Sequence, residues 1–141
     1  MNVRRKARET ALQALYKIDI SAGASGEEAL ELEELAPGSE ARRYCETLVQ
    51  GVTLRIGALD AEIEKHSENW TISRMSVVDR NILRIAVYEL LYSGDVPYKV
   101  IIDEAVELAK KYGTDESGPF INGIIDRIRK VVAEDRSRLS P

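Results

Sequence analysis

The sequence has little of what enzymes and metalloproteins commonly use. Among 141 residues it contains one cysteine, one histidine, one tryptophan and one phenylalanine. Cys45 has no partner in the chain, so an intramolecular disulfide is excluded and a reducing compartment is expected. No Cys-x-x-Cys or His-x-x-x-His spacing occurs that could hold a metal. We therefore expect neither a metal site nor a cofactor.

Long apolar runs are also absent. The longest, such as residues 85–88, are far shorter than the roughly 20 residues of a membrane span. The basic N-terminus is not followed by the apolar stretch of a signal peptide. We expect a cytoplasmic protein without a membrane partner, and its length predicts a single compact domain.

The sequence does not favour catalysis. Cys45 and His66 lie in what reads as one long helix, which would separate them by roughly 30 Å. No glycine-rich phosphate loop is present, and Gly51 and Gly57 fall inside a helical pattern where close helix packing is their expected role. Carboxylates one turn apart at positions 103 and 107 are common on solvated helix faces. We predict that the protein is not an enzyme.

The chain has helical periodicity throughout, because apolar residues recur at spacings of three and four rather than two. No strand is predicted, and short connections favour an all-α antiparallel bundle. The periodicity lapses over residues 68–73, where we expect a loop with a short helical turn and a boundary between two halves of the core. The apolar pattern and its end signals predict three helices in the first half of the chain: one from near Val3 to before Ser21, a short acidic one from Ser25 to before Pro37, and a long one from Ser39 through Ile63. They predict three more in the second half: a central buried helix after Ser76, one from about Tyr98 to Tyr112, and one that starts near Ser117 or Pro119. Gly113 is expected to end the Tyr98–Tyr112 helix in a left-handed conformation.

The charge distribution is uneven although the formal net charge is only -4. Arg4, Arg5, Lys6 and Arg8 place four positive charges within five residues at the start of the first helix. On a helical wheel Arg5 falls within about 40° of Tyr16, with Arg8 between this strip and the buried stripe. Guanidinium groups beside an aromatic ring are a combination that holds single-stranded RNA. The alternative is a solvated helix start, although cations at that end oppose the helix dipole.

Phe120, the only phenylalanine, is a second candidate for contact with RNA. It lies near the start of the last expected helix, where free amide groups can hold a phosphate while the ring stacks on a base. The alternative, that Phe120 anchors this helix to the core, is at least as well supported by spacing. Asp115 and Glu116 just before it would repel a phosphate.

Several recognisable motifs follow one another along nearly the whole chain, at residues 4–9, 13–16, 78–80, 82–90, 95–100, 103–110 and 120–126. Together they resemble the bacterial NusB family. The resemblance implies an all-α fold of about seven helices in two small bundles. With the lapse in periodicity, this predicts subdomains at about 1–68 and 73–133, and the polar end of the sequence predicts a frayed tail at 134–141. It also implies a transcription antitermination factor that binds boxA RNA as a heterodimer with NusE, acts with other Nus factors and RNA polymerase, and in some members forms homodimers.

The resemblance also implies roles for individual residues. NusE contact is implied around the acidic position Asp79. Gly118-Pro119 stands where some relatives carry a basic residue, so phosphate contact there is not implied. RNA contact is implied for Arg4, Arg5, Lys6, Arg8, Tyr16 and Phe120.

Two rival interpretations stay open at this point. One is a helical adaptor that binds only proteins, with the basic cluster as a solvated helix end. The other is a NusB-like domain of a ribosomal RNA cytosine methyltransferase. Such enzymes carry an α/β cofactor domain that this sequence does not contain.

Overall fold

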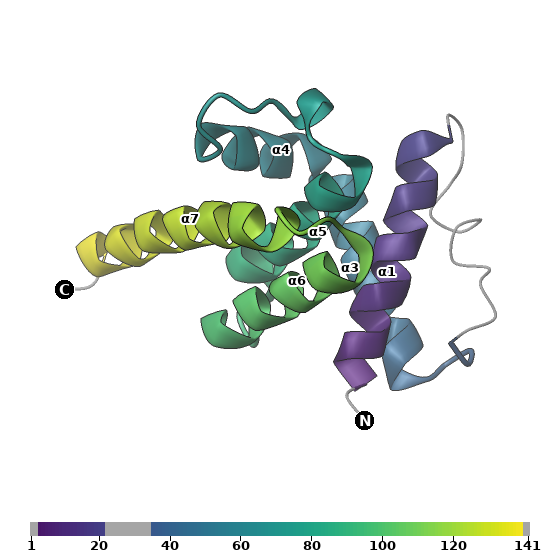
Figure 1. Ribbon diagram of the computed structural model, residues 1–141. Coiled ribbons are helices and arrows are strands. Elements are labelled where there is room, and N and C mark those ends of the chain that lie inside the picture. Colours follow the sequence, from purple (N-terminus) through teal and green to yellow (C-terminus); the bar gives the residue numbers. More distant parts are fainter. Residues whose placement is uncertain (1–2, 22–34, 140–141) are drawn as a thin grey trace.

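The structure is a computed structural model that describes residues 3–21 and 35–139, with side chains to residue 134 (Figure 1). The described residues contain helices and no strand, which confirms the all-α prediction. A 3-10 turn, η1 (Ile72–Arg74), lies in the predicted loop, and a π-helical turn, η2 (Glu89–Ser93), extends the central helix. The acidic helix predicted from Ser25 falls largely outside the described residues. The α-helices are α1 (Val3–Ile20), α3 (Glu40–Leu54), α4 (Ile56–Lys65), α5 (Val77–Tyr88), α6 (Tyr98–Tyr112) and α7 (Ser117–Leu139).

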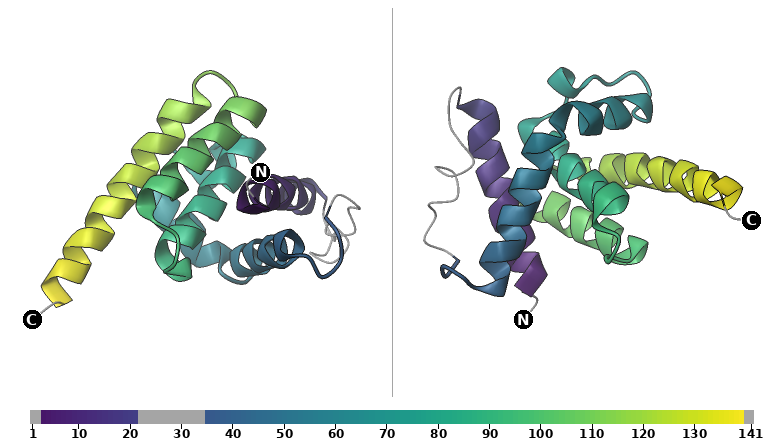
Figure 2. Two further views of the ribbon diagram at one scale, coloured as in Figure 1. Left: turned by 90° about the horizontal axis from the view of Figure 1, so that it is seen from below. Right: turned by 180° about the vertical axis from the view of Figure 1, so that it is seen from behind.

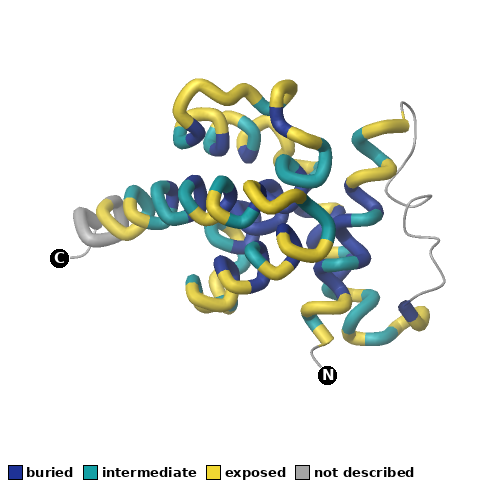
Figure 3. Tube along the Cα trace, in the orientation of Figure 1, coloured by how far each residue is buried: buried dark blue, intermediate teal, exposed yellow. Residues whose placement is uncertain are grey.

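Helix α5 is the centre of the fold, as its wide apolar stripe predicts. It contacts α1, α3, α4, α6 and α7, while α1 packs on α3 and α6 packs on α7 (Figure 2). All eight residues from Asn81 to Tyr88 are buried, and buried segments of the other helices face them (Figure 3). Because α5 contacts both groups of helices, the core is continuous across the predicted subdomain boundary near residues 68–73. The subdomains themselves remain a prediction.

Serine side chains begin two of the helices where the sequence predicts them. The Ser39 hydroxyl accepts a hydrogen bond from the Arg42 amide at 3.1 Å, and Ser76 accepts from the Asp79 amide at 3.0 Å. Each bond satisfies a backbone donor that the first helical turn leaves unpaired. These caps fix the starts of α3 and α5.

The single long helix predicted from Ser39 through Ile63 is wrong, because the chain breaks at Arg55 into α3 and α4. Arg55 has φ −117° and ψ 20°, which is outside the helical region. The apolar spacing continues across the break, so the sequence pattern does not reveal it. The break removes the distance argument against a Cys45–His66 pair, but Cys45 is fully buried and burial raises the pKa of its thiol to about 11. Cys45 is therefore a core residue.

The glycines follow the predictions only in part. Gly51 packs against α5 as expected, since a Cβ there would overlap the Tyr88 ring. Gly57 is exposed with open space around it, so its predicted role in helix packing is wrong. Gly113 has φ −98° rather than the predicted left-handed conformation. Glycine is needed at this position because there is no room for a side chain. A Cβ atom on residue 113 would lie 2.9 Å from the Ala109 carbonyl oxygen and even closer to Ser117.

Candidate nucleic-acid interface

The basic residues at the start of α1 differ in how far they reach solvent. Arg4 is partly exposed, and its Nη2 donates to the Asp95 carboxylate at 3.1 Å. Its guanidinium also lies over the Tyr44 ring, 4.3 Å from the ring centre. Lys6 is exposed one turn before Thr10. Arg4 and Lys6 thus stand at the surface, where a phosphate can reach them.

Arg5 is half exposed and rests on a buried carboxylate. Its Nε and Nη2 donate to Glu104 on α6 at 2.7 to 3.2 Å, while the Glu104 side chain is almost fully buried. This hydrogen-bonded pairing raises the pKa of Arg5 above its ordinary value. The Arg5 guanidinium is held in a fixed direction on the outer face of α1.

Arg8 is buried rather than placed at the edge of the surface strip, and in this respect the structure differs from the helical-wheel expectation. Its Nε and Nη2 donate to the Glu89 carboxylate at 2.9 and 2.8 Å, and its Nη1 donates to Glu104 at 3.4 Å. The Tyr44 hydroxyl also donates to Glu89. The wheel could not show this burial, because η2 and α6 supply the carboxylates from more than 80 residues away. Arg8 links α1 to η2 and α6 inside the protein.

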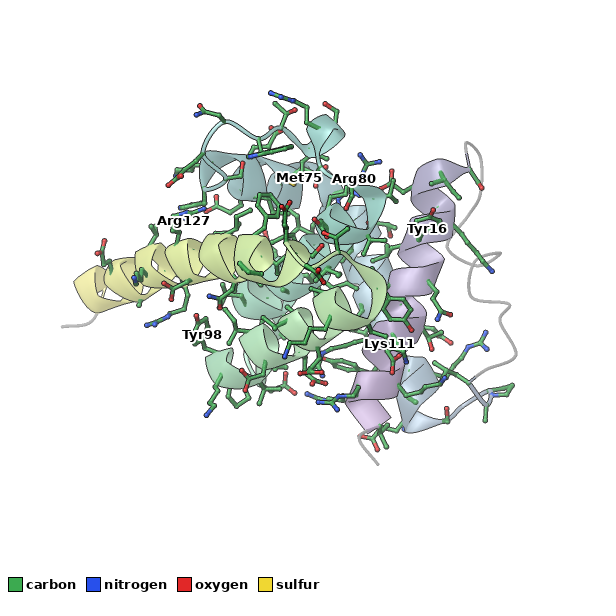
Figure 4. The ribbon with its side chains drawn as sticks, viewed as in Figure 1. Tyr16, Met75, Arg80, Tyr98, Lys111 and Arg127 are labelled. Atoms are coloured by element: carbon green, nitrogen blue, oxygen red, sulfur yellow. The ribbon has the colours of Figure 1, made fainter. Side chains whose placement is uncertain are left out.

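Tyr16 lies on the exposed side of α1, two turns beyond Arg8 (Figure 4). Its ring borders a surface hollow of about 340 Å³ that α1 shares with the start of α5 and the end of α6. The hollow is therefore on the same helix as the basic residues. The other lining residues are Leu12, Gln13, Lys17, Val78 and Tyr112.

Phe120 and Asp79 lie in one hollow, although the sequence assigned them to different partners. This hollow, also about 340 Å³, lies between η1, the start of α5 and the start of α7. The Phe120 ring packs edge-on against Trp70 at 5.9 Å between ring centres, and it is also partly buried against the core. The Asp79 Oδ1 atom is buried and has no hydrogen-bond partner among the described residues. The structure thus brings the predicted NusE residue beside a predicted RNA residue.

Sequence reasoning missed Trp70 as a member of this hollow. Its ring is nearly half exposed, and the Arg74 guanidinium lies 5.4 Å from the ring centre. The sequence did contain a signal for it. Trp70 is the only tryptophan and lies in a stretch without helical periodicity, so the apolar pattern does not place it in the core. Trp70 and Phe120 together form an aromatic wall.

A second missed feature is the ion-pair network that fastens the end of α1 to α5. The Asp19 carboxylate accepts from Arg80 at 2.6 and 2.8 Å, from Asn81 at 2.9 Å and from Arg84 at 3.0 Å. Arg84 also donates to Asp60 on α4 at 2.8 and 2.9 Å. The Arg80 pairing lowers the pKa of Asp19 to about 2. This network positions α1, and with it Tyr16, against α5.

The described part of the chain shows neither a metal site nor a membrane span. Residues 3–21 and 35–134 contain no group of three histidine, cysteine or carboxylate side chains that could hold a metal ion. None of the helices described is both long enough and apolar enough to cross a membrane.

The fold and the surface together define a small all-helical protein that presents a basic helix beside two partly aromatic hollows. The NusB family model matches residues 5–130, and the chain belongs to the NusB family. A curated relative, transcription antitermination protein NusB of Desulfosudis oleivorans, is 46% identical over 134 residues that cover 92% of this chain and 87% of the relative.

Solved structures agree with this assignment. NusB of T. maritima matches with a TM-score of 0.84 and 41% identity over 90% of each chain. A crystal structure of antitermination factors NusB and NusE in complex with dsRNA matches with a TM-score of 0.82 and 32% identity, over 93% of this chain and 98% of that chain. The predicted fold and family are confirmed by these similarities.

Proposed function

We propose that this protein is a transcription antitermination factor that binds boxA RNA as a heterodimer with NusE, and that it has no catalytic activity. The observation that carries the proposal is the exposed surface of α1, where Arg5 lies on the same side as Tyr16 and is flanked by Arg4 and Lys6. Cationic groups attract the phosphates, and an exposed ring can stack on an unpaired base. The NusB–NusE–dsRNA neighbour supports both partners. The protein acts in the cytoplasm with other Nus factors and RNA polymerase.

The roles of the individual residues follow from their positions. Arg4, Arg5 and Lys6 contact phosphates, and Tyr16 contacts a base. Arg8 supports this surface from inside the protein, since its charge is satisfied by Glu89 and Glu104. Phe120 and Asp79 share one hollow, so this region contacts RNA and NusE at neighbouring points. Net acidity elsewhere limits binding to other polyanions.

The test is a titration of fluorescent boxA RNA and of scrambled RNA, with and without NusE, with the oligomeric state measured in the same buffer. We expect boxA to bind more tightly than scrambled RNA, and NusE to increase this difference. The variant Arg5→Gln/Lys6→Gln should lose about tenfold or more in affinity and should show a weaker salt dependence. Lys65→Gln/Lys99→Gln, which removes the same total charge at two exposed lysines elsewhere on the surface, is the matched control.

A helical adaptor that binds only proteins is the alternative. It predicts NusE binding without any difference between boxA and scrambled RNA at any salt concentration. It also predicts that both double variants behave alike.

A further inference from the structure

The junction of α3 and α4 carries exposed apolar side chains with one arginine between them. Leu54, Arg55 and Ile56 all reach solvent, and Leu54 is 80% exposed. In a continuous helix Leu54 and Ile56 would point in nearly opposite directions. The break at Arg55 removes this constraint, so three successive side chains are exposed. With the exposed Tyr92 of η2 these residues form the Arg55 corner, where α3 meets α4 in the view from behind (Figure 2, right).

The Arg55 guanidinium is held over two tyrosine rings. Its central carbon lies 4.6 Å from the centre of the Tyr92 ring and 6.0 Å from that of Tyr88. These two rings stack on each other with their centres 5.7 Å apart. Tyr88 can lie this close to α3 because Gly51 has no side chain. The rings therefore restrain the direction of Arg55 before any partner arrives, which reduces the entropy lost on binding.

The charge of Arg55 is not matched by any carboxylate within residues 3–21 and 35–134. Four carboxylates on the neighbouring elements already bind other arginines, in the pairs Arg42–Glu46, Arg84–Asp60, Arg8–Glu89 and Arg4–Asp95. The N–H groups of a guanidinium form a planar fork that fits the two oxygens of a carboxylate. Arg55 thus presents an unmatched positive charge to a carboxylate from outside the chain.

The surroundings of Arg55 favour a protein over a nucleic acid. Leu54 and Ile56 have no polar group for a base edge or a phosphate, but they can bury apolar side chains of a partner. The guanidinium and the Tyr88 ring already cover much of the Tyr92 ring, so little of it is left for a base to stack on. A carboxylate flanked by apolar groups is the chemistry that this surface complements.

We propose that the Arg55 corner docks a protein segment that carries one carboxylate between two apolar side chains. Arg55 binds the carboxylate, while Leu54 and Ile56 cover the apolar groups. None of these residues lines the hollow beside Tyr16 or the hollow that holds Asp79 and Phe120. The inference therefore goes beyond the proposed function, because it adds a further protein contact that leaves both hollows accessible.

The test is an NMR titration of the ¹⁵N-labelled full-length protein with two synthetic peptides. One is a helical peptide with Leu, Glu and Leu at positions i, i+4 and i+7, and the other is an extended peptide with the sequence Leu-Thr-Glu-Thr-Leu. We expect at least one of them to shift the amide signals of residues 51–58 and 88–94 in a saturable way. Replacing its glutamate with glutamine should weaken binding by about 5- to 10-fold.

Protein variants test the two kinds of contact separately. Arg55→Gln should weaken peptide binding by about tenfold, whereas Arg43→Gln, at an exposed arginine of the same helix, should not. Leu54→Ser should weaken it by about 3- to 10-fold, and Val100→Ser, at an exposed valine on α6, is the matched control. Thermal unfolding of each variant confirms that the fold is retained.

The outcomes separate this docking surface from the proposed function. If neither peptide shifts the signals of the Arg55 corner, or if binding tolerates both Arg55→Gln and loss of the peptide glutamate, the docking surface is wrong. If a scrambled RNA shifts these signals and the peptides do not, the corner binds nucleic acid instead. If Leu54→Ser converts a dimer to a monomer in sedimentation, the corner is a contact between copies of this chain. Arg55→Gln should bind boxA RNA and NusE as the natural protein does, so failure of the docking surface leaves the proposed function standing.

Discussion

Glu104 lies directly behind Arg5, so the same carboxylate that orients this arginine also neutralises it. The Arg5 side chain is 53% exposed, whereas that of Glu104 is 6% exposed. A phosphate that approaches Arg5 from solvent therefore meets a cation whose charge is already partly matched. We therefore expect the affinity of the basic face for RNA to be lower than its number of positive charges suggests.

Replacing Glu104 should strengthen RNA binding. Glu104→Gln removes the negative charge and keeps the side-chain volume, so we expect affinity to rise by about 3- to 10-fold at low salt and the salt dependence to steepen. Filter binding at several salt concentrations measures both quantities. Asp103→Asn makes the same change in net charge at an exposed neighbour and should have a much smaller effect. Weaker binding by Glu104→Gln would mean that orientation of Arg5 matters more than its charge.

We expect Arg8 to contribute more to the stability of the fold than to RNA binding. Arg8→Ala leaves the buried Glu89 carboxylate without its bidentate partner, which should reduce the free energy of unfolding by about 3–5 kcal/mol in urea denaturation. The double variant Arg8→Met/Glu89→Leu removes both charges and should be more stable than Arg8→Ala. Arg4→Ala breaks an exposed pair with Asp95 and the contact with the Tyr44 ring, and it should cost only about 1 kcal/mol. A double variant no more stable than Arg8→Ala would contradict the pairing.

The network around Asp19 should make stability depend on acid pH. The pKa of Asp19 is lowered from 3.8 to about 2, so its stabilising contribution is complete above pH 4 and is lost as the pH falls toward 2. We expect this loss to be about 1–2 kcal/mol after solvent screening. Unfolding measured between pH 6 and pH 2 should show it, and Asp19→Asn should flatten the profile over that range. An unchanged profile in Asp19→Asn would assign the acid sensitivity to other carboxylates.

Alanine at Gly51 and at Gly57 should have opposite effects on stability. A Cβ at Gly51 overlaps the Tyr88 ring, so Gly51→Ala should lower the free energy of unfolding by about 1–3 kcal/mol. Gly57 is an exposed helical position with open space, so Gly57→Ala should raise it by about 0.5–1 kcal/mol. Thermal unfolding of the two variants checks the signs. Two destabilising substitutions would show that α4 needs a glycine at position 57.

Asp79 provides a test of the partner surface. Asp79→Lys reverses the charge beside Trp70 and Phe120, and we expect calorimetry to show about tenfold weaker association with NusE. Asp103→Lys makes the same reversal on the exposed side of α6 and serves as the control. Undiminished association of Asp79→Lys with NusE would remove Asp79 from the interface. Circular dichroism shows whether either variant alters the fold.

The sequence is sufficient for features that depend on near neighbours. The Ser76 cap and the buried stripe of α5 each follow from spacings of three or four residues. The start of α7 at Ser117 is one of the two positions predicted for it. The break at Arg55 could not be predicted, because the apolar spacing continues across it without interruption.

The candidate site was predictable as a set of residue types but not as a geometry. The helical period predicts that Arg5 and Tyr16 lie on one face of α1, and both side chains are exposed in the structure. The burial of Arg8 depends on Glu89 and Glu104, and the closeness of Asp79 to Phe120 depends on how η1, α5 and α7 meet. Such long-range partners leave no periodic signal in a single sequence.

The position of α5 also bears on how the protein unfolds. Because α1, α3, α4, α6 and α7 all rest on this one helix, neither group of helices can be separated without exposing its buried face. We therefore expect a single cooperative transition by calorimetry and by circular dichroism. The proposed RNA-binding and NusE-binding surfaces should therefore be lost together when α5 is destabilised.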